Sequence, residues 1–179
     1  MIEMRIVFDY NRFMIRKAVR NDIDEMIRII DQAKAYLKEQ GVDQWQDGYP
    51  NKEVLLEDIK QGYSYVLEDG PILGTMCFKV ADDPDYVRID GKWLCEGSYG
   101  VIHRIAIDDK YKGEGRAREF LEYAIKACRE SHAVSLRIDT HQDNHSMRRF
   151  LEKNGFIECG MIYIGGVSPR IAYERCVEY

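Results

Sequence analysis

Hydrophobic and polar positions follow two different periods along the chain, and the changes between them mark the predicted elements. Residues 14–19 fit a short strand. Apolar residues then recur at three- and four-residue spacing, which predicts a helix with Asn21 as its N-cap and Gly41 as its end. The same spacing predicts a second helix from about Asn51 to Gly62.

Beyond Gly62 the pattern is mainly that of strands, with two further helices between them. Strands are predicted over 63–68, 72–81, 99–107, 134–139, 156–164 and 170–177, and helices over about 115–130 and from Asn144 to Gly155. In the polar segment 82–98, Asp90-Gly91 is typical of a small hairpin tip. This order predicts an α/β (mixed α+β) fold, with a mixed sheet and helices on both faces.

The first residues either extend this sheet or precede it. Apolar and polar residues alternate from Ile2 to Tyr10, as they do in a strand with one buried face. Residues 1–13 therefore fit an extra edge strand or an N-terminal extension. Residues 14–179 form the single predicted domain, a size typical of one domain.

Composition excludes several classes of protein. Of 179 residues, 45% are hydrophobic and 32% are charged, which excludes a disordered or fibrous chain. The net charge of −5 gives no electrostatic argument for nucleic acid. No apolar run is long enough to span a membrane, and no secretory signal is visible at the N-terminus. We therefore expect a cytoplasmic protein that binds neither nucleic acid nor a membrane.

The five cysteines are widely spaced and include no Cys-x-x-Cys pair. Their number is odd, so a disulfide framework is not expected, and neither is a zinc site built on paired thiolates. Reduced and mostly buried thiols are the prediction, in keeping with a cytoplasmic protein.

The segment with the clearest chemistry is Lys112-Gly113-Glu114-Gly115-Arg116-Ala117, which joins a buried strand to an amphipathic helix. Glycines allow a tight turn, and the unpaired N–H groups at a helix start suit a diphosphate. On two glycines alone, an ordinary turn between strand and helix is the preferred interpretation. The segment is neither the three-glycine dinucleotide fingerprint nor a P-loop.

This segment resembles the Gln/Arg-x-x-Gly-x-Gly/Ala signature of the GNAT superfamily of acyl-CoA-dependent N-acyltransferases, with Lys112 at the Gln/Arg position. Downstream, DTHQDNHSMRRFLEKNGF (139–156) resembles the family's strand, Asn, short helix and Lys-x-Gly-Phe ending. Upstream, MIRKAVRNDIDEMIRII resembles its first strand and helix. The resemblance covers about residues 14–177.

The resemblance implies a GNAT fold, whose central, mostly antiparallel sheet has two parallel strands that splay apart to admit acetyl-CoA, the co-substrate. Strand residues 105–107 would bind the pantetheine arm, and residues 112–117 would bind the pyrophosphate. Met147 would either contact the coenzyme or pack in the core. The residues that the resemblance assigns to the coenzyme are Ile105, Ala106, Ile107, Lys112, Gly113, Glu114, Gly115, Arg116, Ala117, Asn144 and Met147.

The implied reaction is direct transfer of an acetyl group from acetyl-CoA to a primary amine in a ternary complex. An alkylamine of pKa ~10.4 is protonated at pH 7, and freeing its lone pair costs about 4.6 kcal/mol. His103, on the central strand, is the candidate base. The family's usual acid is a Tyr, but Leu151 stands at that position. Either Tyr163 or Tyr173 in a later strand donates the proton, with Tyr163 as the candidate acid, or water does, or catalysis is weak.

The loop after the first helix is the region that borders the acceptor in this family. Trp45, Asp47 and Tyr49 are its candidate acceptor residues, and Glu96 is a weaker one. A small-molecule amine is the favoured acceptor. The alternatives are a protein or peptide acceptor, or a module that binds acyl-CoA with weak or no catalysis. A homodimer is a further possibility.

An alternating run of Asp139, His141, Asp143 and His145 has the residue types of a metal site. It follows a strand and precedes a short helix, so these side chains need not converge. We expect a polar loop that caps the helix, and no metal.

Overall fold

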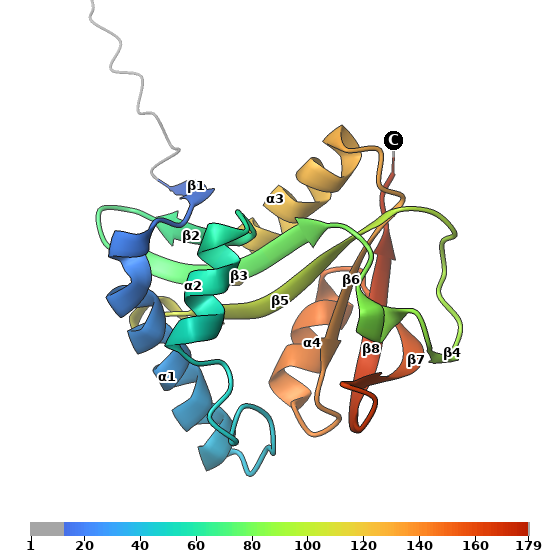
Figure 1. Cartoon of the computed structure of the whole chain (residues 1–179), viewed down its shortest axis with the longest axis horizontal. Helices are drawn as coiled ribbons and strands as arrows, with labels where there is room; N and C mark the ends of the chain where they lie inside the picture. The colour runs from blue at the N-terminus through green and yellow to red at the C-terminus, as the bar shows by residue number, and fades with distance from the viewer. Residues whose placement is uncertain (1–12, 179) are drawn as a thin grey trace, which may run out of the picture.

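One sheet of eight strands organises residues 13–178, the part of the chain that the computed structural model describes (Figure 1). The strands are β1 (Met14–Lys17), β2 (Ser64–Glu68), β3 (Ile72–Val80), β4 (Asp90–Gly91), β5 (Tyr99–Ile107), β6 (Ser135–Thr140), β7 (Ile157–Ile164) and β8 (Ser168–Cys176). Their order in the sheet is β1-β2-β3-β5-β6-β8-β7-β4. Of the pairs in this sheet, β5–β6 is parallel and the others are antiparallel.

Four helices cover the two faces of this sheet, which confirms the predicted mixed fold. They are α1 (Ile23–Glu39), α2 (Lys52–Lys60), α3 (Arg116–Glu130) and α4 (His145–Lys153). The predicted edge strand or extension over residues 1–13 lies outside the described residues, apart from Phe13.

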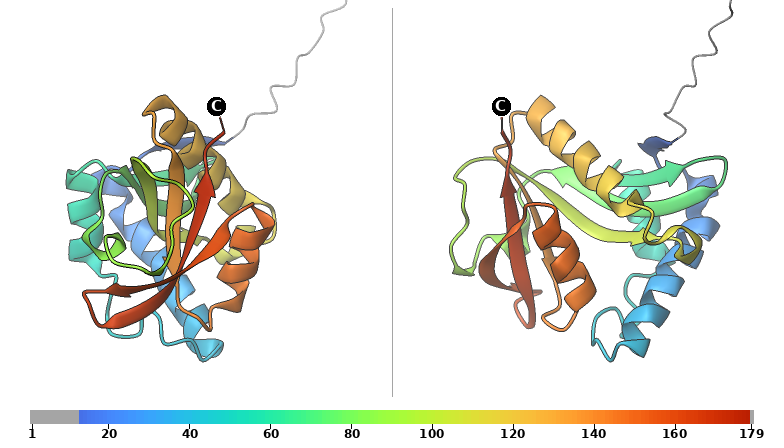
Figure 2. Two further views of the ribbon diagram at one scale, coloured as in Figure 1. Left: turned by 90° about the vertical axis from the view of Figure 1, so that its right-hand side faces the viewer. Right: turned by 180° about the vertical axis from the view of Figure 1, so that it is seen from behind.

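The helices and one long connection divide the core into three parts. α1 and α2 pack on one face of the β1–β3 half, whereas α3 and α4 pack on the opposite face (Figure 2). On the same face as α1 and α2, residues 82–98 cover the other half of the sheet. Tyr86 and Trp93 of this segment, which we call the insertion, pack against Val101, Ile162 and Ala172. Aromatic and aliphatic burial therefore fixes the insertion to the sheet.

The parallel pairing of β5 with β6 ends half-way along β5. Residues 99–102 face residues 135–138 in register, and the pairing goes no further. Just beyond, Arg104 has a φ of 52°, and the register between β3 and β5 shifts. Both are signs of a bulge, which bends a strand and increases its twist. The two parallel strands consequently splay apart (Figure 1), as the family resemblance implies.

The two helices predicted to begin near Asn51 and Asn144 do so and are capped by these residues, whereas the predicted N-cap Asn21 is wrong. Asn51 and Asn144 accept from the amides of Val54 at 3.0 Å and Met147 at 3.2 Å. Asn21 does not cap α1, because a 3-10 turn over Arg20–Asp22 precedes this helix.

Asp90-Gly91 is a two-residue strand rather than a hairpin tip. It pairs with Gly160 and Met161 of β7, so Gly91 lies opposite Gly160. A Cβ on Gly91 would overlap the carbonyl of Cys159, and one on Gly160 would overlap that of Asp90. The hairpin prediction fails because this glycine permits a close approach of two backbones, not a turn.

A buried ion pair anchors the far end of the insertion. The Arg137 Nε lies 2.8 Å from a Glu174 oxygen, and the Arg137 guanidinium lies between the rings of Trp93 and Tyr99. Glu174 also accepts from the Ser135 hydroxyl at 2.6 Å and from the backbone N–H groups of residues 94 and 95. The pair thus has the additional hydrogen bonds that a buried ion pair needs to be tolerated.

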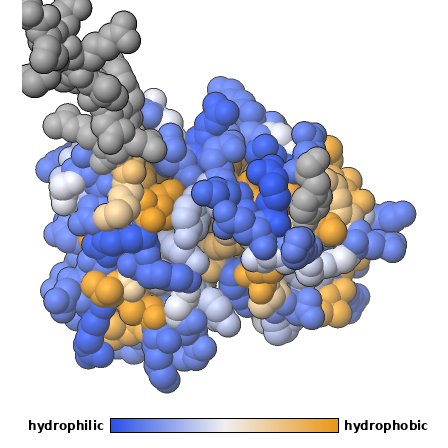
Figure 3. All heavy atoms as spheres, turned by 90° about the horizontal axis from the view of Figure 1, so that it is seen from above, coloured by the Kyte–Doolittle hydropathy of each residue, from blue (hydrophilic) through white to orange (hydrophobic). Residues whose placement is uncertain are grey.

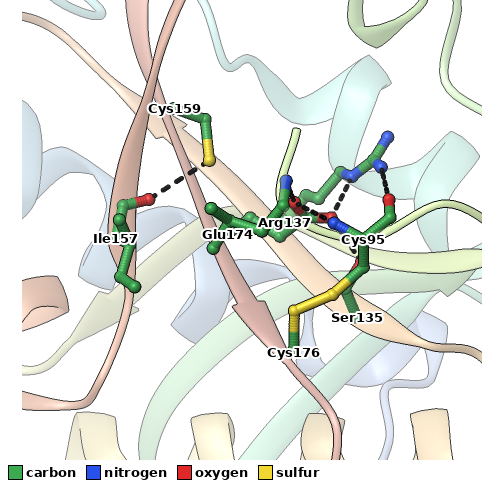
Figure 4. Close-up of a disulfide and its surroundings, with 8 residues drawn as sticks. Cys95, Ser135, Arg137, Ile157, Cys159, Glu174 and Cys176 are labelled. Carbon is green, nitrogen blue, oxygen red and sulfur yellow. Dashed lines mark hydrogen bonds and ion pairs between the residues drawn. A yellow bond between two sulfur atoms is a disulfide. The ribbon is translucent and has the colours of Figure 1, made fainter. Parts of the chain in front are cut away.

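Beside this pair, Cys95 and Cys176 form a disulfide (Figure 4). The prediction of reduced cysteines throughout is therefore wrong. The number and spacing of the cysteines do not reveal this bond, because its two partners are 81 residues apart in the sequence. Cys77, Cys128 and Cys159 are free and buried.

Seen from above, the surface is mainly hydrophilic, with separate apolar patches rather than one continuous apolar face (Figure 3). None of the helices between residues 13 and 178 is long and apolar enough to cross a bilayer.

We expect Cys95→Ser to lower the free energy of unfolding by about 2–4 kcal/mol, because the bond closes a long loop in the unfolded chain. Denaturant titration with and without a thiol reductant measures this. The reductant should destabilise the wild type by a similar amount and leave Cys95→Ser unchanged. Equal stability of wild type and variant under oxidising conditions would contradict the structural role of this bond.

Candidate functional site

A cavity of about 960 Å³ occupies the place where β5 and β6 diverge. Its lining includes side chains from both sides of the sheet. Ala117, Met147 and Phe150 come from the side of α3 and α4, and Asp83 and Asp85 come from the insertion. The cavity therefore joins two chemically different ends, which we call the α3–α4 end and the insertion end.

The α3–α4 end contains most of the residues that the resemblance assigns to the coenzyme. Those that line the cavity are Ile105, Ala106, Ile107, Lys112, Gly113, Ala117, Asn144 and Met147. Glu114, Gly115 and Arg116 belong to the same turn but do not line it. Gly113 and Gly115 have φ values of 81° and 80°, a conformation that favours glycine, and α3 begins directly after them. The first N–H groups of α3 have no partner within the helix, so this turn offers donors to an anion.

Arg104, at the bulge of β5, is tied to α2. Its Nε and Nη2 each donate to one oxygen of Asp58 at 2.8 Å, and its Nη1 donates to the Tyr49 hydroxyl. The side chains of Arg104 and Asp58 are only 12% and 13% exposed. This bidentate pair holds a backbone conformation that is unfavourable for a residue with a Cβ.

His103 is the centre of the insertion end. Its Nε2 lies 2.9 Å from Asp83 Oδ2, which is also 3.1 Å from the Lys79 ammonium. On the other side of the ring, Nδ1 lies 3.9 Å from Asp139 Oδ1, and the Tyr86 hydroxyl donates to that same oxygen at 2.7 Å. One imidazole thus stands between two carboxyl groups.

The two carboxyl groups have pKa values that shift in opposite directions. Burial acts to raise the pKa of Asp83, but the hydrogen bonds and charges of His103 and Lys79 outweigh it and hold this pKa below its usual range. Burial raises the pKa of Asp139, and His103 and Tyr86 oppose this only in part. Asp83 is therefore ionised at neutral pH and accepts hydrogen bonds only, so the imidazole Nε2 must donate to it.

Three of the four candidate acceptor residues, Trp45, Asp47 and Tyr49, line the cavity. Trp45 also packs against the core beneath α1, so it anchors the loop as well as lining the cavity. Their loop is closed by Gln44, which the sequence analysis did not single out. Gln44 Oε1 accepts from Thr140 Oγ1 and His141 N, both at 3.3 Å, and from the side-chain amide of Asn144 at 3.2 Å.

Two candidates lie elsewhere. Tyr163 is not among the cavity residues, and its hydroxyl donates to Asp90 at 2.9 Å. Glu96 is exposed on the insertion and also does not line the cavity. Leu151, at the family's usual Tyr position, is fully buried in the core.

The alternating Asp and His run does not converge. Asp139 turns toward His103, whereas His141 accepts from the amide of Asp143 at 3.2 Å. Among residues 13–178, no three His, Cys, Asp or Glu side chains are arranged to hold a metal ion.

The sequence analysis placed no residue next to His103, and it considered Asp139 only within the alternating Asp and His run. Asp83 and Tyr86 come from the insertion, whose path no periodicity describes. For Asp139 the strand pattern is informative. Side chains alternate between the two faces of β6, so Asp139 lies on the same face as Arg137. In the register with β8, Arg137 lies opposite Glu174 and Asp139 opposite Ala172.

Comparison with known proteins gives a consistent result. The family model described as the acetyltransferase (GNAT) family matches residues 27–156. A crystal structure of a GNAT-family acetyltransferase from Streptococcus agalactiae is 35% identical, with a TM-score of 0.84, over 93% of this chain and 96% of the other. No curated protein sequence matches.

More distant structures share the fold alone. A GNAT-family acetyltransferase from Listeria monocytogenes is 20% identical, with a TM-score of 0.70, over 92% of this chain and 94% of the other. The PaiA N-acetyltransferase from Thermoplasma acidophilum, solved in complex with coenzyme A, is 16% identical, with a TM-score of 0.69, over 92% of this chain and 98% of the other.

We expect Asp58→Asn to lower the free energy of unfolding by about 3 kcal/mol, because it leaves a buried guanidinium without its counter-charge. Thermal or denaturant unfolding measures this. Glu57→Gln is the matched control, since the neighbouring carboxylate of α2 has only surface partners and its loss should change the free energy of unfolding far less. A similar effect of both substitutions would argue against a special role of the Arg104–Asp58 pair.

Proposed function

The chain belongs to the GNAT family of acetyltransferases, and on this premise we propose that it acetylates the primary amine of a small molecule by direct attack on acetyl-CoA in a ternary complex. The observation that carries this proposal is the single cavity that joins the glycine turn before α3 to His103. Each end of the cavity offers the chemistry that one of the two substrates needs.

The α3–α4 end suits the coenzyme. The N–H groups of the turn over residues 112–117 and the start of α3 would hold the pyrophosphate, with Lys112, which pairs with Asp109 at 2.5 Å, as a nearby cation. Within the described part of the chain, the side of β5 that faces β6 has no strand partner beyond Ile102, so the backbone of residues 105–107 would be free to bind the pantetheine arm. Met147 lines the cavity and also packs against the core, so it would contact the arm without leaving its place in the fold.

The insertion end suits the amine. Since His103 Nε2 donates to Asp83, the lone pair of the neutral imidazole is on Nδ1, which faces Asp139. Nδ1 would accept the amine's proton, and the ionised Asp83 would stabilise the resulting imidazolium. This removes the main obstacle to the reaction, the protonation of the amine at neutral pH.

The transfer itself would follow from this arrangement. The amine lone pair attacks the thioester carbonyl, a C–N bond forms, and the C–S bond breaks as the coenzyme leaves as a thiolate. A backbone N–H near Ile105 is the candidate donor to the carbonyl oxygen. Because Leu151 cannot donate a proton and Tyr163 lies outside the cavity, water would protonate the thiolate.

A small acceptor is favoured over a peptide because three segments close the insertion end. The loop over residues 44–49 is tied to the start of α4 through Gln44. The insertion is tied to β6 through Tyr86 and to the β7–β8 turn, where the Gly165 amide donates to Asp85 at 2.9 Å. A peptide acceptor would require these hydrogen bonds to break.

Binding of the coenzyme is tested by calorimetric titration with acetyl-CoA. We expect Gly115→Trp to abolish or weaken binding by at least about tenfold, because a large side chain in the turn blocks the pyrophosphate. Gly70→Trp is the matched control: Gly70 has a φ of 73° and equally open surroundings, but it lies in the β2–β3 turn. Loss of binding in both variants would indicate misfolding, and no binding by the wild type would sink the acetyltransferase proposal.

The role of His103 is tested by steady-state release of CoA. We expect His103→Gln to lower kcat by about 10²- to 10⁴-fold, the usual contribution of a general base, with little effect on acetyl-CoA binding. His132→Gln, an exposed histidine after α3, is the control. An unchanged kcat in His103→Gln would assign the proton to another group.

A further inference from the structure

The insertion end also contains a guanidinium that the proposed chemistry does not use. Arg170 of β8 lines the cavity and is half-buried. Asp139 pairs with Ala172 across β6 and β8, so Arg170, two residues away, lies on the same face of the sheet. Its charge acts on the Asp139 carboxyl. Arg170 is therefore a neighbour of the groups around His103.

The hydrogen bonds of Arg170 leave one edge of its guanidinium free. Nη1 donates to the Ser168 hydroxyl at 2.7 Å and to the carbonyl of Pro169 at 2.8 Å, which orients the side chain. Across residues 13–178, no hydrogen bond is formed by its Nε or Nη2, and no carboxylate lies within ion-pair distance of it. The Nε–Nη2 edge is the fork that binds a carboxylate in a bidentate manner.

Two arginines with well-buried side chains show what this edge does when it has a partner. Arg104, which also lines the cavity, uses Nε and Nη2 on the two oxygens of Asp58. Arg137 directs Nε to Glu174 and Nη2 to the Cys95 carbonyl. Arg170 differs from both in holding its fork oriented and unpaired beside a candidate base.

We infer that the acceptor is an amine that also carries a carboxylate, and that Arg170 binds this carboxylate through its Nε–Nη2 edge while His103 receives the proton of the amine. This inference rests on the proposed function. It assigns Arg170 a role in specificity, because its guanidinium would contact the acceptor and not the reacting atoms.

The charges in the cavity favour a carboxylate over other groups. Asp85 and Asp139 line the same end, so a phosphate, with up to two negative charges, would be repelled there. A purely cationic amine would leave Arg170 unpaired and would be repelled by it. An acceptor with one amino group and one carboxylate satisfies Arg170 without adding net charge.

The test compares α-amino acids with the amines that their decarboxylation gives, for example L-leucine with isopentylamine, L-phenylalanine with phenethylamine and L-lysine with cadaverine. CoA release gives kcat and KM for each pair. We expect the wild type to prefer the amino acid in kcat/KM by about 10- to 100-fold, the value of a charge-assisted hydrogen-bond pair. Arg170→Leu should remove this preference through KM, and Arg170→Lys should restore only part of it.

Arg175→Leu is the matched control, since it removes a guanidinium from the same strand outside the cavity. It should keep the wild-type preference. Equal or faster turnover of the amines by the wild type would overturn the inference and leave the proposed function intact, as would an equal effect of Arg170→Leu on both members of a pair. If acetyl-CoA binds but no member of any pair is turned over, the small-amine proposal fails, and this inference fails with it.

Discussion

The structure depends on one interruption of backbone pairing, the point where β5 stops pairing with β6. Four residue pairs hold the parallel strands together up to Ile102 and Ile138, and the bulge at Arg104 then bends β5 away. Backbone N–H and C=O groups without partners are costly in a sheet interior. They are tolerated here because the cavity beside them is open to solvent and to a ligand. The positions of the glycine turn, His103 and the acceptor loop all follow from this divergence.

The second requirement is that the insertion returns to the same place on the sheet every time the chain folds. Arg137 and Glu174 provide this, because a buried ion pair is stable only when all its hydrogen bonds are made. Residues 94 and 95 supply part of those hydrogen bonds, so a displaced insertion would leave Glu174 incompletely satisfied. The same insertion carries Asp83 and Tyr86 to the candidate site, which links the fixed far end of this segment to the geometry around His103.

Sequence periodicity predicts the elements well because helices and strands here bury one regular face. It also locates the glycine turn and His103, since both lie on or next to regular elements. It fails where position depends on contacts distant in sequence. Asp83, Gln44 and the Cys95–Cys176 bond come from irregular segments whose paths are set by packing, and Gly91 serves a close approach to Gly160 that resembles a turn in the sequence. Tyr163 could not be excluded from the site without the register of β7.

The absence of the family's Tyr at Leu151 becomes less surprising when the two proton transfers are compared. Freeing an alkylamine at pH 7 costs about 4.6 kcal/mol, whereas a thiolate with a conjugate-acid pKa of ~8.5 lies only about 2 kcal/mol above its thiol. The larger of the two costs is therefore at the amine. The charged groups of the cavity gather at that end, where Asp83 and Lys79 are organised around His103. The position of Leu151 instead contributes to the core under α4. With charged groups arranged around the candidate base, the proposed protonation of the thiolate by water needs no further acid.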